Sequence, residues 1–318
     1  MSTMQAWVHT LKYEAQDIIS VELRPMPGET LPVFEAGAHI DLHLPGGWVR
    51  SYSLANDCRE RHRYLLGILK DKASRGGSRS VHEQLRVGMT LTIGAPRNNF
   101  PLHEDADHAV LIAGGIGVTP ILSMAQRLQS LDRSFEVVYL ARSRPAAAFI
   151  ETLKALACPV HWHFDSEAGG PPDLKALLAQ RSPKGNTHYY ACGPAPMLDA
   201  FEKSCAELAY ANAHIERFAA LEVKAADDAR PHFTVELRKS QKTFEVTPDT
   251  SLHKQLLALK VNVPFSCEEG ICGSCETRVL EGTPDHRDMV LSASEQASNQ
   301  AMMVCVSGCK SARLVLDL

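Results

Sequence analysis

Long apolar runs, an excess of basic residues and repeats are all missing from this sequence of 318 residues. No hydrophobic stretch approaches the ~18–20 residues of a membrane-spanning helix, so we expect no membrane segment. The 33 lysines and arginines are outnumbered by 37 aspartates and glutamates, which argues against a nucleic-acid partner because such binders usually carry a basic surface. Residues 1–17 contain acids early and no apolar core, so we expect no secretory signal. These absences predict a cytoplasmic protein whose thiols stay reduced.

Nine cysteines in a reducing compartment indicate ligands or catalysts rather than disulfides. Cys267, Cys272 and Cys275 follow the C-x4-C-x2-C spacing of plant-type 2Fe–2S ferredoxins, with Cys305 as a remote fourth ligand. Structural zinc is the alternative, but it usually shows two close cysteine pairs. Cys309 could replace Cys305 as a ligand, although a small buried thiol is the simpler role.

Three regions differ in their patterns. Residues 1–102 read as short strands separated by proline and glycine, which predicts an antiparallel β-barrel. Residues 103–225 alternate strands with helices, including helices expected at 119–131, 146–157 and 194–209, which predicts an α/β domain with a parallel sheet. Residues 226–318 form a small cysteine-bearing α+β unit after a linker at 224–231.

Two glycine-containing turns follow strands of the α/β region. Gly114, Gly115 and Gly117 open a helix, where backbone N–H groups and the helix dipole favour phosphate. The segment 190–194 ends another strand, and parallel sheets bind ligands at such strand ends. A glycine turn alone also fits a plain strand-to-helix connection.

Two segments of the barrel suit a flavin. A strand at 50–53 carries arginine, serine and tyrosine, which can serve a phosphate and a flat ring or form an outward polar row. The segment 74–78 is rich in N–H donors and hydroxyl groups, which suits either a phosphate or a flexible hairpin tip.

The order of these motifs resembles the phthalate dioxygenase reductase family over nearly the whole chain. The resemblance rests on RSYSLAN (50–56), RGGS (75–78), AGGIGVTPILSMA (113–125), ACGP (191–194), IERF (215–218), SCEEGICGSC (266–275) and DHRDMVL (285–291). It implies a barrel that binds FMN rather than FAD, a nucleotide domain, and a C-terminal ferredoxin domain of the β-grasp type.

The resemblance also implies cofactor contacts. For FMN the expected residues are Arg50, Ser51, Tyr52, Ser53, Ile68, Leu69, Lys70, Gly76, Gly77, Ser78, Arg79, Thr119 and Phe218. For NAD they are Gly114, Gly115, Gly117, Arg142, Cys192, Gly193 and Pro194. Phe218 also reads as an ordinary core residue.

The implied function is a reductase that passes electrons from NADH through FMN and the cluster to a partner oxygenase, typically a Rieske-type aromatic dioxygenase or demethylase. A haem-thiolate monooxygenase is an alternative acceptor, and a non-enzymatic iron–sulfur sensor is an alternative role. Hydride and electron transfer belong to the cofactors, so we expect no catalytic side chain, and the histidines read as solvated or structural. The segment 141–144 by itself suits the 2′-phosphate of NADPH, whereas the resemblance favours NADH. Two acids, Glu268 and Glu269, read as a solvated pair or as a guide for the partner.

Overall fold

The structure is a computed structural model that describes residues 2–72, 75–219, 232–247 and 250–318. It divides into two compact units, Met1–Phe218 and Ala219–Leu318, which we describe separately. Within the described ranges, no helix has both the length and the apolar character that crossing a membrane requires.

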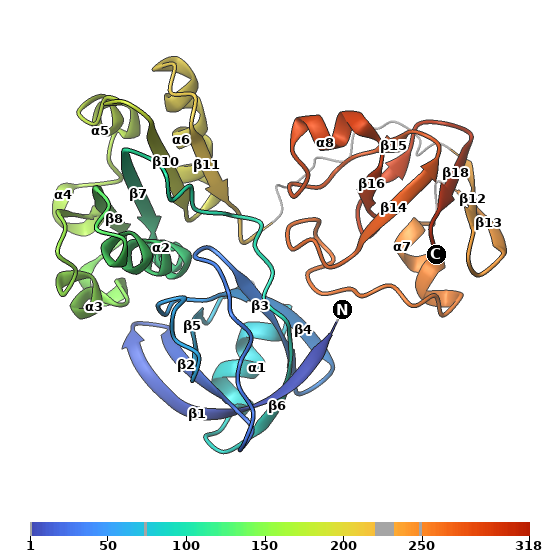
Figure 1. Cartoon of the computed structure of the whole chain (residues 1–318), viewed down its shortest axis with the longest axis horizontal. Helices are drawn as coiled ribbons and strands as arrows, with labels where there is room; N and C mark the ends of the chain where they lie inside the picture. Colours follow the sequence, from blue (N-terminus) through green and yellow to red (C-terminus); the bar gives the residue numbers. More distant parts are fainter. Residues whose placement is uncertain (1, 73–74, 220–231, 248–249) are drawn as a thin grey trace. The chain divides into compact units, whose positions relative to one another are not determined.

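The first part of Met1–Phe218 is a six-stranded antiparallel barrel, as predicted (Figure 1). Its strands are β1 (Thr3–Ala15), β2 (Ile18–Pro25), β3 (His39–Leu44), β4 (Trp48–Ser53), β5 (Tyr64–Leu69) and β6 (Thr90–Gly94). They follow the order β4-β3-β6-β1-β2-β5, and a bridge between Leu54 and Leu66 joins the two edges. Helix α1 (Gly77–Gln84) contributes Val81 to the barrel core.

The second part is a five-stranded parallel sheet in the order β11-β10-β7-β8-β9, again as predicted. The strands are β7 (His108–Gly114), β8 (Phe135–Ala141), β9 (Val160–Phe164), β10 (Thr187–Cys192) and β11 (Ala213–Glu216). Helices α2 (Val118–Ser130) and α3 (Ile150–Lys154) share one apolar core with the sheet, whereas α5 (Leu174–Ala179) and α6 (Ala195–Glu207) share another. The sheet is therefore covered on both faces (Figure 1).

The helix expected at 146–157 is shorter than the sequence suggests, because α3 spans only Ile150–Lys154. The preceding Phe149 has a left-handed backbone with φ of 58°. The Ala148 amide instead donates to the Tyr139 hydroxyl at 3.0 Å, and Phe149 is buried in the core. Tertiary burial therefore overrides the helix propensity of the alanine run.

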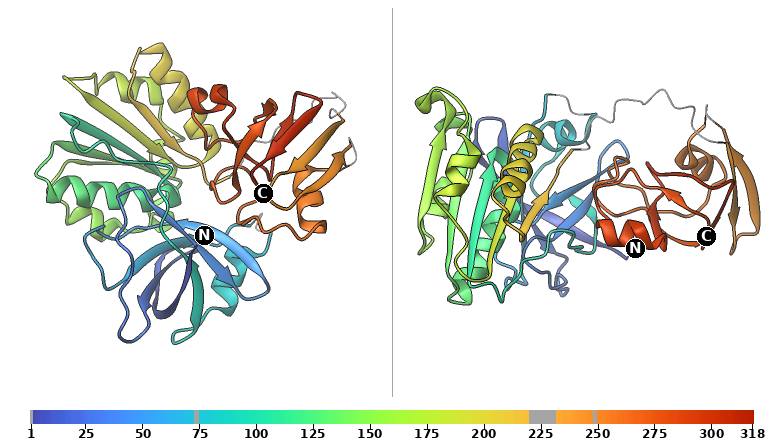
Figure 2. Two further views of the ribbon diagram at one scale, coloured as in Figure 1. Left: turned by 45° about the vertical axis from the view of Figure 1, so that its right-hand side comes forward. Right: turned by 90° about the horizontal axis from the view of Figure 1, so that it is seen from above.

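The unit Ala219–Leu318 is a mixed sheet in the order β13-β12-β18-β14-β16 (Figure 2). Its elements are β12 (Phe233–Leu237), β13 (Lys242–Val246), α7 (Leu252–Ala258), β14 (Glu276–Glu281), β15 (Pro284–Asp285), α8 (Ala293–Ser298), β16 (Ala301–Met303), β17 (Gly308–Cys309) and β18 (Arg313–Leu316). Leu252 and Leu256 anchor α7 in the core of the sheet. The predicted linker at 224–231, and with it the domain boundary after residue 225, lies outside the described residues.

Candidate functional site

The N-terminus of α1 meets strand β4 at one end of the barrel. A Cβ atom on Gly77 would lie 2.5 Å from Cγ of Arg50, and one on Gly76 would lie 2.6 Å from the Trp48 ring. Gly76 also has a positive φ of 116°. These glycines let the helix terminus approach β4 and leave its N–H groups beside a guanidinium group. The arrangement suits a phosphate, because helix N-termini and arginine both favour anions.

This geometry corrects one of our interpretations. The described part of the segment, 75–78, is not a hairpin tip, because Gly76 caps α1 and Ser78 lies in its first turn. The Ser78 hydroxyl accepts a hydrogen bond from the Asp71 amide at 3.2 Å, and the neighbouring Arg79 is exposed. Ser74 lies outside the described residues.

Other predicted flavin residues lie on the second half of β4 and on strand β5. The Ser51 hydroxyl donates a hydrogen bond to Asp41 at 2.7 Å. Burial raises the pKa of Tyr52 to about 12, so the Tyr52 hydroxyl stays protonated. The Ile68 carbonyl already contacts His82 Nε2 at 2.9 Å.

Three other predicted flavin residues lie at the end of β5 or pack against it. Leu69 and Lys70 lie at the end of β5, where the Lys70 ammonium group pairs with Glu83. The Thr119 methyl group packs where a side chain on Gly67 would be, which holds α2 against the barrel.

The two predicted nucleotide turns lie side by side at the C-terminal ends of β7 and β10. Cys192 pairs with Ala113 in the parallel register. A Cβ atom on Gly117 would overlap the Cys192 carbonyl oxygen, and one on Gly114 would lie 2.8 Å from Pro194 Cδ. The backbones of the two turns therefore meet directly, which is the arrangement that binds a nucleotide pyrophosphate at strand ends.

A carboxyl group that our sequence analysis missed lies beside these turns. Glu216 ends β11 opposite Cys192, and its Oε2 accepts from the Ser53 hydroxyl at 3.2 Å and from the Cys192 thiol at 3.9 Å. Desolvation raises the pKa of Glu216 to about 8, although both hydrogen bonds lower it. Burial also raises the pKa of Cys192 well above its usual range. Near neutral pH this site therefore holds a protonated carboxyl, a thiol and a hydroxyl.

Only one signal in the sequence could have pointed to Glu216. The segment 215–218 places an acid at the end of a strand that neighbours Cys192. Two residues later, Phe218 has 40% of its side chain exposed, so the reading of this residue as core is wrong. An exposed phenylalanine next to the site is available to stack on a flat ring.

The two arginines after β8 differ in their surroundings. Arg144 forms a bidentate pair with Glu167, at 2.6 and 3.1 Å, and its guanidinium lies 4.5 Å from the Phe164 ring. Arg142 is exposed and, within the described part of the chain, forms no ion pair. Of the two arginines in the segment 141–144, Arg144 is therefore already neutralised by a carboxylate.

The cysteines of the last unit fit a 2Fe–2S cluster. Cys267 is hydrogen-bonded to Cys272, and Cys275 to Cys305, so the four thiols form two pairs, as two tetrahedral irons would require. The Glu269 amide donates to Cys267 Sγ at 3.3 Å.

The loop around the cysteines depends on Gly270. This glycine has a φ of 71°, and a Cβ atom there would lie 2.6 Å from Val306 and 3.1 Å from the Asp288 backbone. Asp288 is buried, and its Oδ2 accepts from the Leu291 amide at 2.9 Å. The segment 285–291 thus packs against the cysteine loop at Gly270 and supports it.

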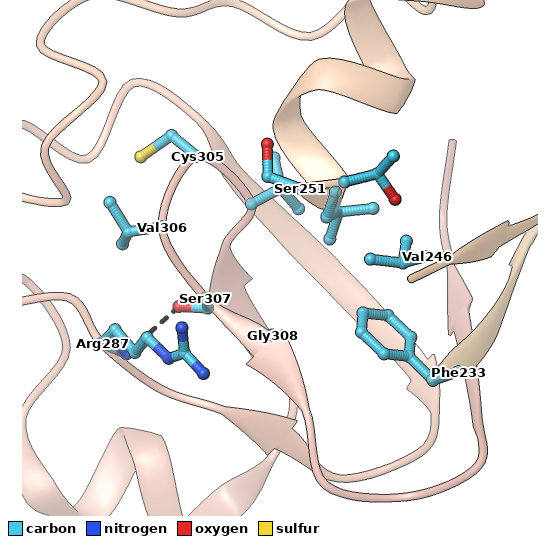
Figure 3. Close-up of a pocket in the computed structure, with 11 residues that line it drawn as sticks. Phe233, Val246, Ser251, Arg287, Cys305, Val306, Ser307 and Gly308 are labelled. Atoms are coloured by element: carbon cyan, nitrogen blue, oxygen red, sulfur yellow. Dashed lines mark hydrogen bonds between the residues drawn. The ribbon is translucent and has the colours of Figure 1, made fainter. Parts of the chain in front are cut away.

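Cys305 follows β16 on a loop tied down by a hydrogen bond of 3.3 Å from the Arg287 amide to Ser307 (Figure 3). A cavity of about 30 Å³ borders this loop, enough for one water molecule and no organic cofactor (Figure 3). Cys309 is fully buried, and its thiol contacts the Thr283 carbonyl at 3.4 Å and the Ser311 hydroxyl at 3.2 Å. Its partners are thus outside the cysteine pairs, which favours Cys305 as the fourth ligand.

Comparisons with known proteins agree with this geometry. Residues 235–310 match the model of the 2Fe-2S iron-sulfur cluster binding domain, and residues 111–203 match that of the oxidoreductase NAD-binding domain. Phenoxybenzoate dioxygenase subunit beta of Ectopseudomonas oleovorans is 46% identical, over 100% of this chain and 98% of that protein. Vanillate O-demethylase oxidoreductase of a Pseudomonas species is also 46% identical, over 98% of each chain.

Two solved structures share the whole architecture. An intact type IV self-sufficient cytochrome P450 monooxygenase matches with a TM-score of 0.90 and 37% identity, over 99% of this chain but only 41% of that one. Phthalate dioxygenase reductase, described as a modular structure for electron transfer from pyridine nucleotides to [2Fe-2S], matches with a TM-score of 0.73 and 38% identity, over 100% and 98% of the chains. This chain therefore belongs to the phthalate dioxygenase reductase family, the reductase components of oxygenase systems that carry electrons from NADH through a flavin to a 2Fe–2S cluster.

Proposed function

We propose that this chain oxidises NADH, holds its flavin as FMN, and delivers electrons to a Rieske-type oxygenase that hydroxylates or demethylates an aromatic compound. The observation that carries the proposal is the meeting of Ser53, Cys192 and Glu216, which joins the barrel to the C-terminal ends of β10 and β11. The naming of relatives after a dioxygenase and a demethylase supports the class of partner.

FMN is favoured over FAD by the α1 terminus. The N-terminus of α1 is formed by Gly76, Gly77, Ser78 and Arg79, and Arg50 adds a positive charge beside it. A terminal phosphate fits this compact end. The flavin ring and its ribityl chain would be held by Ser51, Tyr52, Ser53 and the backbone of Ile68–Lys70. Thr119 would approach the flavin from the nucleotide domain, and Phe218 would stack on the exposed face of the ring.

When bound, the flavin accepts a hydride from NADH and releases electrons singly, which joins a two-electron donor to a one-electron cluster. The chain's own residues position the reactants and control protons. The pyrophosphate of NADH would approach the backbone of the two nucleotide turns, at Gly114, Gly115, Gly117, Gly193 and Pro194. Glu216, protonated near neutral pH, holds a proton beside Ser53 and Cys192 and keeps a negative charge away from the nicotinamide.

The pairing of Arg144 with Glu167 supports a preference for NADH. Glu167 occupies the Arg144 guanidinium, and a 2′-phosphate would have to displace this carboxylate and lie near its charge. Arg142 stays available for the pyrophosphate, whose charge both cofactors share.

The electrons would leave through the cysteine loop. Cys267, Cys272, Cys275 and Cys305 hold the cluster in this proposal, and Glu268 on the same loop is exposed. A partner with a basic patch would be steered to this rim, and the effect would weaken with added salt.

A second acceptor is favoured by one observation. The P450 monooxygenase that matches this chain with a TM-score of 0.90 contains a similar region within a longer protein. A separate haem-thiolate monooxygenase is therefore the second candidate partner.

Reconstitution decides between the candidates. The purified holoprotein and NADH are combined in separate reactions with a purified Rieske-type aromatic oxygenase and with a purified haem-thiolate monooxygenase, and product is measured against NADH consumed. We expect coupled turnover that requires all three components. Turnover with a haem-thiolate enzyme alone, or a released flavin with the mass of FAD, would contradict the proposal.

A further inference from the structure

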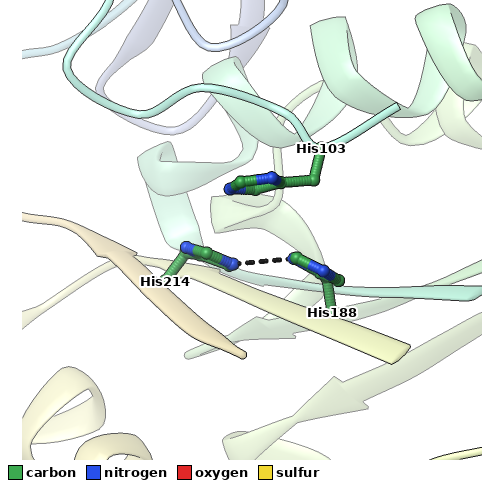
Figure 4. A group of neighbouring side chains, drawn as sticks. All are labelled: His103, His188 and His214. Carbon is green, nitrogen blue, oxygen red and sulfur yellow. Dashed lines mark hydrogen bonds between the residues drawn. The ribbon is translucent and has the colours of Figure 1, made fainter. Parts of the chain in front are cut away.

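Three histidines from separate parts of Met1–Phe218 converge at the end of the parallel sheet that lies opposite the nucleotide turns. His188 lies near the start of β10, His214 lies on β11, and His103 lies in the segment between β6 and β7 (Figure 4). A ring nitrogen of each lies within 4.8 Å of those of the other two. Among the described residues the group consists of histidines alone, with the Asp105 carboxylate near enough to act on His188 electrostatically.

Hydrogen bonds determine which nitrogens carry protons. His188 Nε2 lies 3.2 Å from Oδ1 of Asn186, and an amide oxygen can only accept, so Nε2 of His188 is the donor. In the neutral ring, Nδ1 of His188 therefore carries no proton, and it accepts a hydrogen bond from His214 Nε2 at 2.9 Å. Asn212 also donates to Asn186 Oδ1 at 3.1 Å, which fixes that oxygen in place.

This pattern is the one that prepares a histidine for a metal. Histidine ligands almost always donate their second ring N–H to an oxygen acceptor, which sets the tautomer and the ring orientation. His188 is 6% exposed and already held in this way. Desolvation also lowers the pKa of His214 to about 4 and lowers that of His188, so both rings are neutral near pH 7.

The third ring completes the group from above. His103 stacks over His214 with ring centres 5.0 Å apart and over His188 at 4.5 Å (Figure 4). Its backbone amide donates to the Tyr190 hydroxyl at 2.8 Å, which holds the segment near the sheet while the exposed ring can turn. With metal–nitrogen bonds of about 2.0–2.1 Å, three tetrahedral ligands lie about 3.4 Å apart. Metal binding therefore requires the exposed His103 ring to turn out of its stacked orientation, so that one of its nitrogens points at the ion.

We propose that His103, His188 and His214 bind a divalent transition-metal ion of the zinc, nickel or copper class, with water as a further ligand. The ion replaces the proton between His188 and His214, and His214 then carries its proton on Nδ1. Imidazole ligands suit these ions better than magnesium or calcium, which prefer oxygen. Bound metal would tie the segment between the barrel and the parallel sheet to β10 and β11.

Calorimetric titration of the oxidised holoprotein, with its cluster assembled, tests the proposal with zinc chloride as the probe. We expect one zinc ion per chain, and we expect zinc to raise the temperature at which the flavin is released. His103→Gln and His214→Gln should each abolish both effects. His43→Gln removes an exposed histidine from β3 and should leave both unchanged.

A copper titration identifies the ligands without relying on stability. The EPR spectrum of one equivalent of Cu²⁺ should show splitting from imidazole nitrogens in the wild type, and this splitting should change in His103→Gln. Equal zinc binding by wild type and His214→Gln, or no zinc binding by a folded wild type, would overturn the proposal. NADH oxidation by the zinc-free protein is a separate readout, so loss of the metal site leaves the proposed reductase function untouched.

Discussion

The Ser53 hydroxyl donates a hydrogen bond of 3.2 Å to the Glu216 carboxyl group across 163 positions of sequence. Ser53 belongs to the flavin barrel and Glu216 to the nucleotide sheet. This contact joins the two domains beside Cys192, and it adds a titratable carboxyl group that our sequence analysis did not include among the site residues.

Glu216→Gln should change the pH dependence of stability. The folded protein holds the pKa of Glu216 at about 8, against 4.5 in its ordinary setting, so between these values the unfolded chain has lost a proton that the folded chain keeps. Wild-type stability should therefore fall relative to the variant as pH rises from about 5 to 8, by at most about 1.4 kcal/mol per pH unit. Flavin release on heating, recorded at several pH values, measures this difference. Parallel curves for the two proteins would show that the carboxyl group is ionised in the fold.

Gly77→Ala should weaken FMN binding. The new methyl group would lie 2.5 Å from Arg50 Cγ and push the guanidinium from the helix terminus. We expect an increase in Kd of roughly tenfold, or about 1.4 kcal/mol, in a fluorescence titration of the apoprotein. Gly88→Ala is the control for general destabilisation, because its φ of 87° strains any side chain there while nothing lies within 4 Å of the added atom. If both variants lose FMN equally, general destabilisation of the barrel is the cause.

Glu167→Gln should improve the use of NADPH. Removal of the carboxylate frees Arg144 for a 2′-phosphate, so kcat/KM for NADPH should rise several-fold while that for NADH changes little. Glu151→Gln, which breaks an exposed pair with Lys154 in the same domain, should alter neither value. An unchanged NADPH value in Glu167→Gln would mean that Arg144 does not face the ribose.

Cys305→Ala and Cys309→Ala should behave differently. The first removes a thiol that is paired with Cys275, so the visible absorption of the cluster should disappear while the flavin spectrum remains. The second removes a buried thiol that contacts Thr283 and Ser311, so the cluster should persist. The opposite result would make Cys309 the fourth ligand.

Features confined to one stretch of chain could be predicted from the sequence. The spacing from Cys267 to Cys275 identifies the cluster because its ligands share one loop, and the barrel and parallel sheet follow from local strand and helix patterns. The short α1 was missed because a glycine pair reads as a turn, whereas here Gly76 caps a helix.

Sites assembled from distant segments could not be predicted in this way. Glu216 reaches Ser53 only through the register of β10 and β11, and the three histidines come from three separate segments. No spacing rule connects such residues, because tertiary packing alone brings them together.

Anaerobic addition of one equivalent of NADH to the oxidised holoprotein, followed by optical and EPR spectroscopy in rapid-mixing experiments, tests the electron path most directly. The account predicts that the flavin absorption falls first and that the EPR signal of a reduced 2Fe–2S cluster then appears. In Cys305→Ala the flavin should still be reduced, with no such signal. A cluster that stays oxidised in the wild type while the flavin is fully reduced would contradict the account.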